Sequence, residues 1–315
     1  MMEINNSSVT DAVPTAGAVP TAGAVPTAAI RKPIPPPLIL RPTRGLASLN
    51  LRDLWVYREL IYFMTWRDLK VRYKQTVLGA TWVVIQPLLQ TVIFTLLFHR
   101  AAGFTADSGA PYPIFSFAAL LPWNMFAHAL TTAGLSLVNN RNMLTKVYFP
   151  RLIIPLAPIL ASLVDFLIAF GVLAGVMLYY HFDPAAGYTI HLTPALLALP
   201  LFLLLALITT LGVSLWLSAL NVMYRDIGHV IPFLTQIWFF ITPIVYSSRA
   251  VTPKWQIVYA LNPMVGVVNG FRWALIGTRT APDPMLAASV AVALLILVSG
   301  LFYFRNMERV FADEI

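Results

Sequence analysis

Ionisable side chains are rare in the apolar stretches of this chain, and they limit the chemistry that it can do. Asp165 is the one acid or base deep within an apolar segment long enough to cross a membrane. A carboxylate at that depth must face a partner, a cavity or water, because hydrocarbon does not solvate its charge. Two interpretations stay open: a site on a transport path, or a hydrogen-bonded residue that packs between helices, near His128 or a helix end.

Motifs of the common enzyme classes are absent from the sequence. No lysine follows a glycine, which excludes the Gly-Lys pair of a phosphate-binding P-loop. The patterns G-x-S-x-G and H-E-x-x-H do not occur, the five histidines lack metal-ligand spacing, and there is no cysteine. We therefore expect no catalytic residue, no metal site and no cofactor in this chain. It is expected to move something, or to hold a subunit that does.

A cluster of bases provides the second set of candidates. Arg67, Lys70, Arg72 and Lys74 belong to the segment 48–75, where apolar residues recur at roughly helical spacing. The segment is too charged to span a bilayer and contains two tryptophans. We expect an amphipathic helix at the membrane interface, with its bases toward lipid phosphates. The alternative is a basic helix that packs on another subunit.

Composition indicates which elements must position these residues. Of the 315 residues, 58% are hydrophobic and only 11% are charged, and the mean hydropathy is +0.75. Soluble domains carry about 25% charged residues, so a soluble enzyme, a disordered chain and a coiled coil are excluded. The apolar runs are long rather than alternating, which predicts an all-α polytopic membrane protein. The net charge of +8 then concerns membrane topology, and no nucleic-acid partner is expected.

Six apolar segments are each near or above the ~20 residues that cross ~30 Å of hydrocarbon. They are 77–98, 113–138, 152–180, 194–220, 230–247 and 284–304. The fifth is short and is interrupted by two prolines. Six spans place both termini on one side, and sixteen of the 21 Lys and Arg residues then lie on that side. Since positive residues stay in the cytoplasm, both termini are expected there.

The chain divides into four parts. Residues 1–47 carry AVPTAG repeats and three consecutive prolines, which predicts a disordered cytoplasmic tail. Residues 48–75 form the amphipathic interfacial helix, 76–305 hold the six spans, and 306–315 make a short cytoplasmic C-terminus. The sequence assigns no role to the repeats.

The segment 249–280 is apolar but broken by proline and glycine, and the charge distribution places it outside. Irregular backbone at membrane depth is tolerated only against protein or a water-filled path. We therefore expect two short re-entrant helices that gate the outer mouth. The gate candidates are Asn262, Pro263, Gly266, Gly270 and Arg272. An ordinary amphipathic surface loop is the alternative.

The cytoplasmic loop 139–151 is short and basic, yet it carries several apolar residues. We expect a short helix across the membrane plane that presents them to a groove on a soluble partner. These residues are Met143, Leu144, Val147, Tyr148 and Phe149. The alternative is that they rest on lipid headgroups.

Gly171 and Gly175 form a second contact motif, which predicts close helix packing, either within the subunit or at a dimer seam.

Several strings, taken in order, resemble the ABC-2-type permeases for polysaccharide export. They are RDLKVRYKQ at 67–75 with Trp82 and Gln86-Pro87, KVYFPR at 146–151, YRD at 224–226, LNPM at 261–264 and GFR at 270–272. Each string is short, but the ordered set runs from about residue 50 to about residue 305. The N-terminal repeats lie outside the resemblance.

The resemblance implies a six-span subunit that works as a homodimer in the bacterial inner membrane. It also implies two copies of a separate P-loop ATPase, which bind the ATP and Mg²⁺. The cargo of such permeases is a lipid-linked glycan: O-antigen of lipopolysaccharide, capsule or teichoic acid. By this resemblance, 139–150, including Lys146, is the coupling helix that contacts the ATPase. Likewise 249–280 holds the outer gate, and 51–75 lies beside the place where the lipid carrier enters.

A glycan path needs surfaces on which sugars slide with little specificity, and aromatic rings provide them. The path candidates are Tyr112, Phe115, Trp123, Phe126, Trp238 and Phe239, with lipid-facing or packing roles as the alternative for each. The four clustered bases would attract the phosphates of the carrier, or would only anchor the helix at the inner face. An ABC-2 exporter of a lipid or drug and an ion-coupled secondary transporter remain alternatives.

Overall fold

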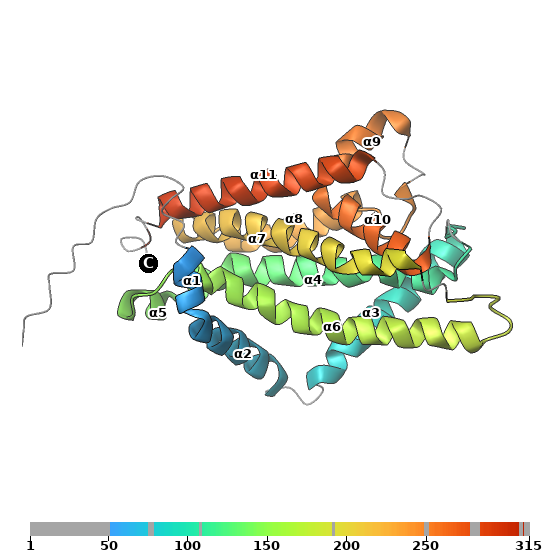
Figure 1. Cartoon of the computed structure of the whole chain (residues 1–315), viewed down its shortest axis with the longest axis horizontal. Helices are drawn as coiled ribbons and strands as arrows, with labels where there is room; N and C mark the ends of the chain where they lie inside the picture. The colour runs from blue at the N-terminus through green and yellow to red at the C-terminus, as the bar shows by residue number, and fades with distance from the viewer. Residues whose placement is uncertain are drawn as a thin grey trace, which may run out of the picture. The chain divides into compact units, whose positions relative to one another are not determined.

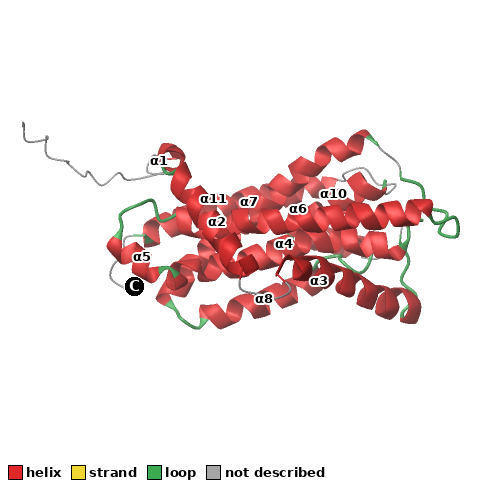
Figure 2. Cartoon of the chain, turned by 90° about the horizontal axis from the view of Figure 1, so that it is seen from below, coloured by secondary structure: helices red, strands yellow, loops and turns green. Residues whose placement is uncertain are grey.

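A computed structural model of the chain describes residues 51–74, 79–106, 109–190, 193–248, 252–277, 284–308 and 311. All of them belong to one structural unit, Gly45–Ile315. Every regular element in the described ranges is a helix, as Figure 2 shows. The predicted tail at 1–47 lies outside the described residues.

Five helices are long and apolar enough to cross a membrane, by length and composition: Thr81–Ala101, Tyr112–Asn139, Ile153–Phe182, Pro194–Met223 and Met285–Met307. They correspond to the predicted first, second, third, fourth and sixth spans. In element terms they are α3 (Gly79–Phe94) with the π-helical η2 (Thr95–Ala101), α4 (Tyr112–Asn139), α6 (Ile153–Phe182), η3 (Pro194–Ala198) with α7 (Leu199–Met223), and α11 (Pro284–Met307). The chain is therefore a polytopic helical membrane protein.

The predicted fifth span coincides with a shorter helix, α8 (Ile227–Ile241), of 15 residues. The helix stops at Thr242, whose ψ of 137° is extended. Thr242 precedes Pro243, and a residue before proline is disfavoured in the helical region. At about 1.5 Å per residue, α8 is too short to cross the hydrocarbon alone. The six-span count stays a prediction.

Helix α4 forms the centre of the bundle. It packs against α3, α6, α7 and α8, and also against α10 (Pro263–Ile276), as Figure 1 shows. In an apolar 18-residue stretch of α4, 78% of the residues are buried. The corresponding shares are 11% for the span Thr81–Ala101 and 17% for the span Met285–Met307. Large side chains of α4 such as Phe117, Leu120 and Leu130 have no exposed surface and build the main core. The outer helices therefore take their positions from contacts with α4.

The predicted interfacial segment forms two helices, α1 (Leu51–Val56) and α2 (Arg58–Lys74), which separate at Tyr57. An apolar cluster joins α2 to the ends of α6, α7 and α11 through Met64, Phe149 and Phe304. Arg151 adds a hydrogen bond from its guanidinium to the carbonyl of Glu308. The same end of the bundle thus holds α1, the short α5 (Arg141–Lys146) and the end of α11 (Figure 1).

Glycines allow α7 and α11 to pack closely against each other. A Cβ on Gly300 would lie 2.4 Å from the carbonyl oxygen of Gly212, so only glycine permits this approach of α11 to α7. Gly171 and Gly175 differ, because a Cβ on either would meet no atom within 4 Å. The packing of this pair within the subunit, one of the two predicted alternatives, therefore does not occur in the described part of the chain.

Candidate functional site

The carboxylate of Asp165, on α6, is bound by two neighbouring residues of α2. Arg72 forms an ion pair with one carboxylate oxygen, and the hydroxyl of Tyr73 donates to the other. The side chains of Arg72 and Asp165 are only 25% and 19% exposed, so the pair is weakly screened. Burial and the bond to Asp165 raise the pKa of Tyr73, which keeps its hydroxyl protonated as a donor.

A cleft of about 730 Å³ opens beside this ion pair, between α2, α3, α4 and α6. Most of its lining is apolar, with Trp82, Met125 and Phe166 among its walls. Its polar lining consists of the ion pair with Gln86, Asn124, His128 and Ser162. The cleft therefore has both apolar and polar lining, and all of its polar residues except Arg72 lie on helices that are long enough to span a membrane.

Gln86, Asn124 and His128 were missed as candidates by sequence reasoning. Each is neutral or nearly so at pH 7, and a search for acids and bases inside the spans passes over them. Their spacing could have identified them. Gln86 and Gln90 lie four residues apart on α3, and so do Asn124 and His128 on α4, which places each polar pair on one face of its helix. The structure joins the two helices there, because Asn124 donates a 2.9 Å hydrogen bond to Gln90.

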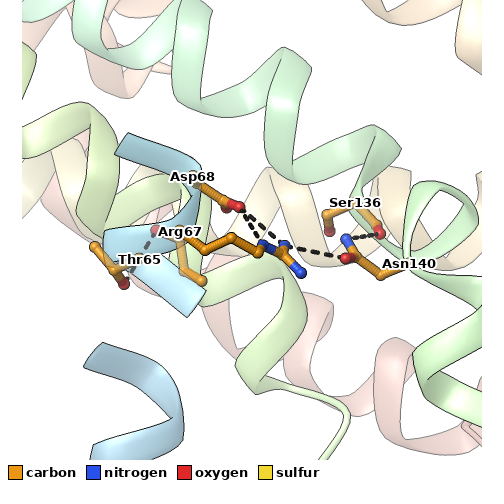
Figure 3. A network of polar contacts seen from close by, with 6 residues as sticks. Thr65, Arg67, Asp68, Ser136 and Asn140 are labelled. Atoms are coloured by element: carbon orange, nitrogen blue, oxygen red, sulfur yellow. Dashed lines mark hydrogen bonds and ion pairs between the residues drawn. The ribbon is translucent and has the colours of Figure 1, made fainter. Parts of the chain in front are cut away.

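The structure separates the four clustered bases into two kinds. Arg72 is held by Asp165, and Arg67 bonds Asp68 at 2.9 Å and Asn140 at 3.1 Å. Asn140 in turn donates to the carbonyl of Ser136, so Arg67 ties α2 to the end of α4 (Figure 3). These two arginines therefore have packing partners within the chain.

Lys70 and Lys74 differ from the arginines, because both are exposed and neither forms an ion pair with a described residue. They line a shallow groove of about 550 Å³ with Trp66 and Tyr73. Two mobile ammonium groups beside an aromatic ring can attract an anionic headgroup. Of the four predicted phosphate ligands, these two have their charge available.

The six aromatic residues predicted to line a path belong to the main core or pack against it, and their rings form a group of four and a separate pair, Tyr112 and Phe115. Ring centroids are 5.4 Å apart for Trp123 and Phe126, 5.1 Å for Phe126 and Trp238, and 5.7 Å for Trp123 and Phe239. The four residues on α4, namely Tyr112, Phe115, Trp123 and Phe126, are at most 3% exposed. Trp238 and Phe239, on α8, are partly exposed. In the single chain, the four α4 rings pack in the core.

Asn262 connects α8 to the two short helices of the predicted gate segment, α9 (Pro253–Ala260) and α10. Its side-chain oxygen caps α10 by accepting from the amide of Met264 at 3.0 Å. The same oxygen accepts from the indole of Trp238 at 2.9 Å, and its amide donates to Thr242 at 3.1 Å. Pro263 follows at the first helical position, where its missing N–H costs nothing.

Arg272 is buried on α10, and its guanidinium binds backbone carbonyls. Its guanidinium donates to the carbonyls of Pro243 and Ile244 at 2.6 Å each, and to that of Tyr246 at 3.2 Å. A fourth bond reaches the carbonyl of Phe115 at 3.2 Å, and the cation lies 3.5 Å from the Phe115 ring centroid. Arg272 thus fixes the turn after α8 against the start of α4.

The gate glycines allow α10 to approach its neighbours. A Cβ on Gly266 would lie 2.7 Å from the side chain of Ser289, and one on Gly270 would lie 2.3 Å from the ring of Phe202. Phe202 is 2% exposed and cannot swing away. Both glycines therefore serve the packing of α10 against α11 and α7.

The loop after α4 presents two kinds of apolar residue. Tyr148 is 87% exposed and Val147 is 56% exposed, while Phe149 is 5% exposed and lies in the apolar cluster of that end. Met143 and Leu144 pack partly against the same cluster, and Lys146 is exposed. The surface open to a partner therefore centres on 146–148, with Phe149 as its anchor.

Sequence comparisons with known proteins match most of this chain. The family model described as ABC-2 type transporter matches residues 59–276, from α2 to the end of α10. An O-antigen export system permease protein RfbA of Myxococcus xanthus is 30% identical over 270 residues, which cover 84% of this chain and 98% of that protein. A protein of the same description from Klebsiella pneumoniae is 28% identical over 255 residues, covering 81% and 94%. A further Klebsiella relative is 26% identical over 267 residues, covering 84% and 99%.

Proposed function

The chain belongs to the ABC-2 type transporter family, and from this premise we propose that it is the transmembrane subunit of an ATP-driven polysaccharide exporter. The observation that carries the proposal is the nearly full-length match to permeases described as O-antigen exporters, at 98%, 94% and 99% of their lengths. The cargo we propose is a lipid-linked glycan. An ABC-2 exporter of a lipid or drug would share the fold, and the three relatives favour the glycan.

ATP hydrolysis belongs to a separate subunit in this proposal. The sequence has no Gly-Lys pair, so this chain lacks the P-loop that binds ATP and Mg²⁺. We propose a complex of two permease chains and two ATPase chains. The exposed surface at 146–148 supports contact with the ATPase, because Tyr148 and Val147 are apolar side chains that solvent alone does not favour.

The carrier lipid approaches, in this proposal, along α2. Lys70 and Lys74 offer charge to its phosphates, whereas Arg67 and Arg72 hold α2 against α4 and α6. Exposed Tyr62, Phe63 and Trp66 on the same helix support a position at the membrane interface. We propose that the chain lies in the inner membrane of a bacterium, as its family resemblance implies, with both termini in the cytoplasm, which the charge distribution supports if the chain has six spans.

The outer gate and the path remain part of the proposal. Asn262 and Arg272 tie α8, α10 and the start of α4 into one body, which supports a gate that moves as a unit. Trp238 and Phe239 are partly exposed and can meet a passing sugar, with the buried rings of α4 packed behind them. Asp165 is assigned a packing role, because Arg72 and Tyr73 already satisfy both of its oxygens.

The test is to purify the tagged chain from its native host in mild detergent and identify its stoichiometric partners. The proposal predicts one P-loop ATPase per permease chain, and loss of surface polysaccharide when the permease gene is deleted. Two results together would contradict it: the permease is isolated without a partner even after gentle cross-linking, and the deletion strain keeps its surface glycan. Asp165 and ion-driven transport would then be examined first.

A further inference from the structure

We propose that the cleft between α2, α3, α4 and α6 is a binding site for a neutral sugar ring of the exported glycan. In this site Gln86, Asn124 and His128 hydrogen-bond the sugar hydroxyls, and Trp82 covers one apolar face of the ring. The inference rests on the proposed function, since it names which part of the cargo the permease recognises. None of these residues is among the aromatic path candidates or the gate residues.

The polar side chains of the cleft would be unfavourably placed if only lipid filled it. The side chains of Gln86 and His128 are exposed, and Trp82 is 54% exposed. All three belong to the helices Thr81–Ala101 and Tyr112–Asn139, which are long enough to span a membrane. A polar side chain turned toward hydrocarbon leaves its hydrogen bonds unmade, which is unfavourable in an apolar phase. Such groups therefore indicate water or a polar ligand in the cleft.

The charge balance of the cleft favours a neutral ligand. Among the described residues that line the cleft, Arg72 and Asp165 are the one cation and the one anion, and they are bound to each other, so the pair carries no net charge. The remaining polar groups are two amides, a hydroxyl and an imidazole. Amides donate and accept at once, which matches sugar hydroxyls that do both. The available cations, Lys70 and Lys74, line the separate groove on α2, where a phosphate fits better.

The lining and the size of the cleft agree with a sugar ring. The indole of Trp82 provides a flat apolar face, and the C–H face of a sugar ring needs such a surface. The volume of about 730 Å³ lies within the range of about 300–1,000 Å³ that is usual for small-molecule sites. The cleft is therefore large enough for a sugar unit and too small for a polymer, so it recognises one part of the glycan.

The test uses the absence of cysteine from the chain, which makes any introduced thiol unique in the permease. Ala169→Cys places a reporter on the cleft lining without removing a proposed ligand. Ala174→Cys is the matched control, because it lies exposed on the same helix outside the cleft. The permease, purified with its ATPase and held in lipid nanodiscs, is labelled with a maleimide. The probes are octyl glucoside and octyl phosphate, which share a chain and differ in headgroup, each below its micelle-forming concentration.

We expect octyl glucoside to slow labelling of the Ala169→Cys variant several-fold and octyl phosphate to leave it unchanged. Gln86→Ala with Asn124→Ala should abolish the protection, whereas Gln236→Ala, an exposed glutamine on α8, should keep it. Protection by octyl phosphate alone or by both probes, or equal protection at Ala174→Cys, overturns the proposal, as does no protection at all. If the ATPase co-purifies in these preparations while glucoside gives no protection, the sugar site fails and the proposed function stands.

Discussion

Arg72 and Asp165 lie 93 residues apart and form an ion pair that joins the basic helix α2 to the third long helix, α6. The sequence left open what the carboxylate of Asp165 faces within its span. In the structure its partners are the guanidinium of Arg72 and the hydroxyl of Tyr73. The ion pair also removes Arg72 from the set of bases that can bind phosphate. The position of α2 against α6 therefore depends on a charge inside the bundle.

Asp165→Asn tests the packing role directly. The substitution keeps the shape but removes the charge that Arg72 needs, so we expect a loss of about 1–3 kcal/mol in unfolding free energy. Thermal unfolding in detergent measures it, with Arg72→Gln and the double variant completing a mutant cycle. Export per folded molecule should stay normal and independent of the proton gradient. Loss of export with normal stability and assembly would instead favour ion coupling.

Gly270→Ala should destabilise the chain, although alanine is the better helix former. The new Cβ would lie 2.3 Å from the buried ring of Phe202, and such overpacking costs about 1–3 kcal/mol. Gly171→Ala is the matched control, since its Cβ meets nothing within 4 Å and should be neutral or stabilising. Unfolding temperatures of the two variants give the comparison. Equal effects would contradict the packing described for α10.

Sequence reasoning found the long spans because composition and length alone decide them. It did not find the partner of Asp165, since Arg72 is distant in sequence and belongs to a segment interpreted only through its membrane contacts. It also grouped Phe149 with Tyr148, because adjacent residues in a short loop carry no signal for which one turns inward. The segment of α8 was predicted as a fifth span despite its two prolines, and the helix ends for a local reason, because Thr242 precedes Pro243. Contacts between distant segments account for the partner of Asp165 and for the burial of Phe149.

Tyr148→Ala should affect ATPase binding, whereas Phe149→Ala should affect stability, although the two residues are neighbours. Tyr148 is 87% exposed, so its loss should weaken ATPase binding and leave unfolding unchanged. Phe149 is 5% exposed, and truncating it should cost about 3–5 kcal/mol of stability. Pull-down of the ATPase and thermal unfolding, measured on both variants, separate the two outcomes. If Tyr148→Ala keeps full ATPase binding, the proposed contact surface is wrong.

Arg272→Lys should loosen the turn at 243–246. Lysine cannot hold several carbonyls in the planar arrangement of a guanidinium, so bonds at 2.6 Å to Pro243 and Ile244 are lost. Hydrogen exchange by mass spectrometry should then become faster in that turn and at the start of α4. Arg100→Lys, an exposed arginine near the end of η2, is the control and should change little. Unchanged exchange in the turn would exclude the fixing role of Arg272.

Lys70→Gln with Lys74→Gln should weaken binding to anionic headgroups without destabilising the fold. Both side chains are exposed and unpaired in the described part of the chain, so their charge serves no internal contact. Each lysine near an anionic surface contributes about 1 kcal/mol, so roughly a tenfold loss or more is expected for the pair. Binding of a short-chain phosphatidylglycerol to the detergent-purified permease measures it, and Lys70→Gln alone is compared with Arg58→Gln, since each removes one charge from an exposed side chain of α2. An equal loss in the control would indicate general attraction only.

The proposed role of this chain is to form the membrane path of an ATP-driven glycan exporter. Its most direct measurement places the purified permease and its ATPase in sealed vesicles that contain the host's own lipid-linked glycan. Transfer of the glycan across the bilayer is followed by its protection from an externally added glycosidase. We expect transfer that requires ATP and stops when the ATPase is omitted. Transfer that ignores ATP, or ATP turnover that moves no glycan, would contradict it.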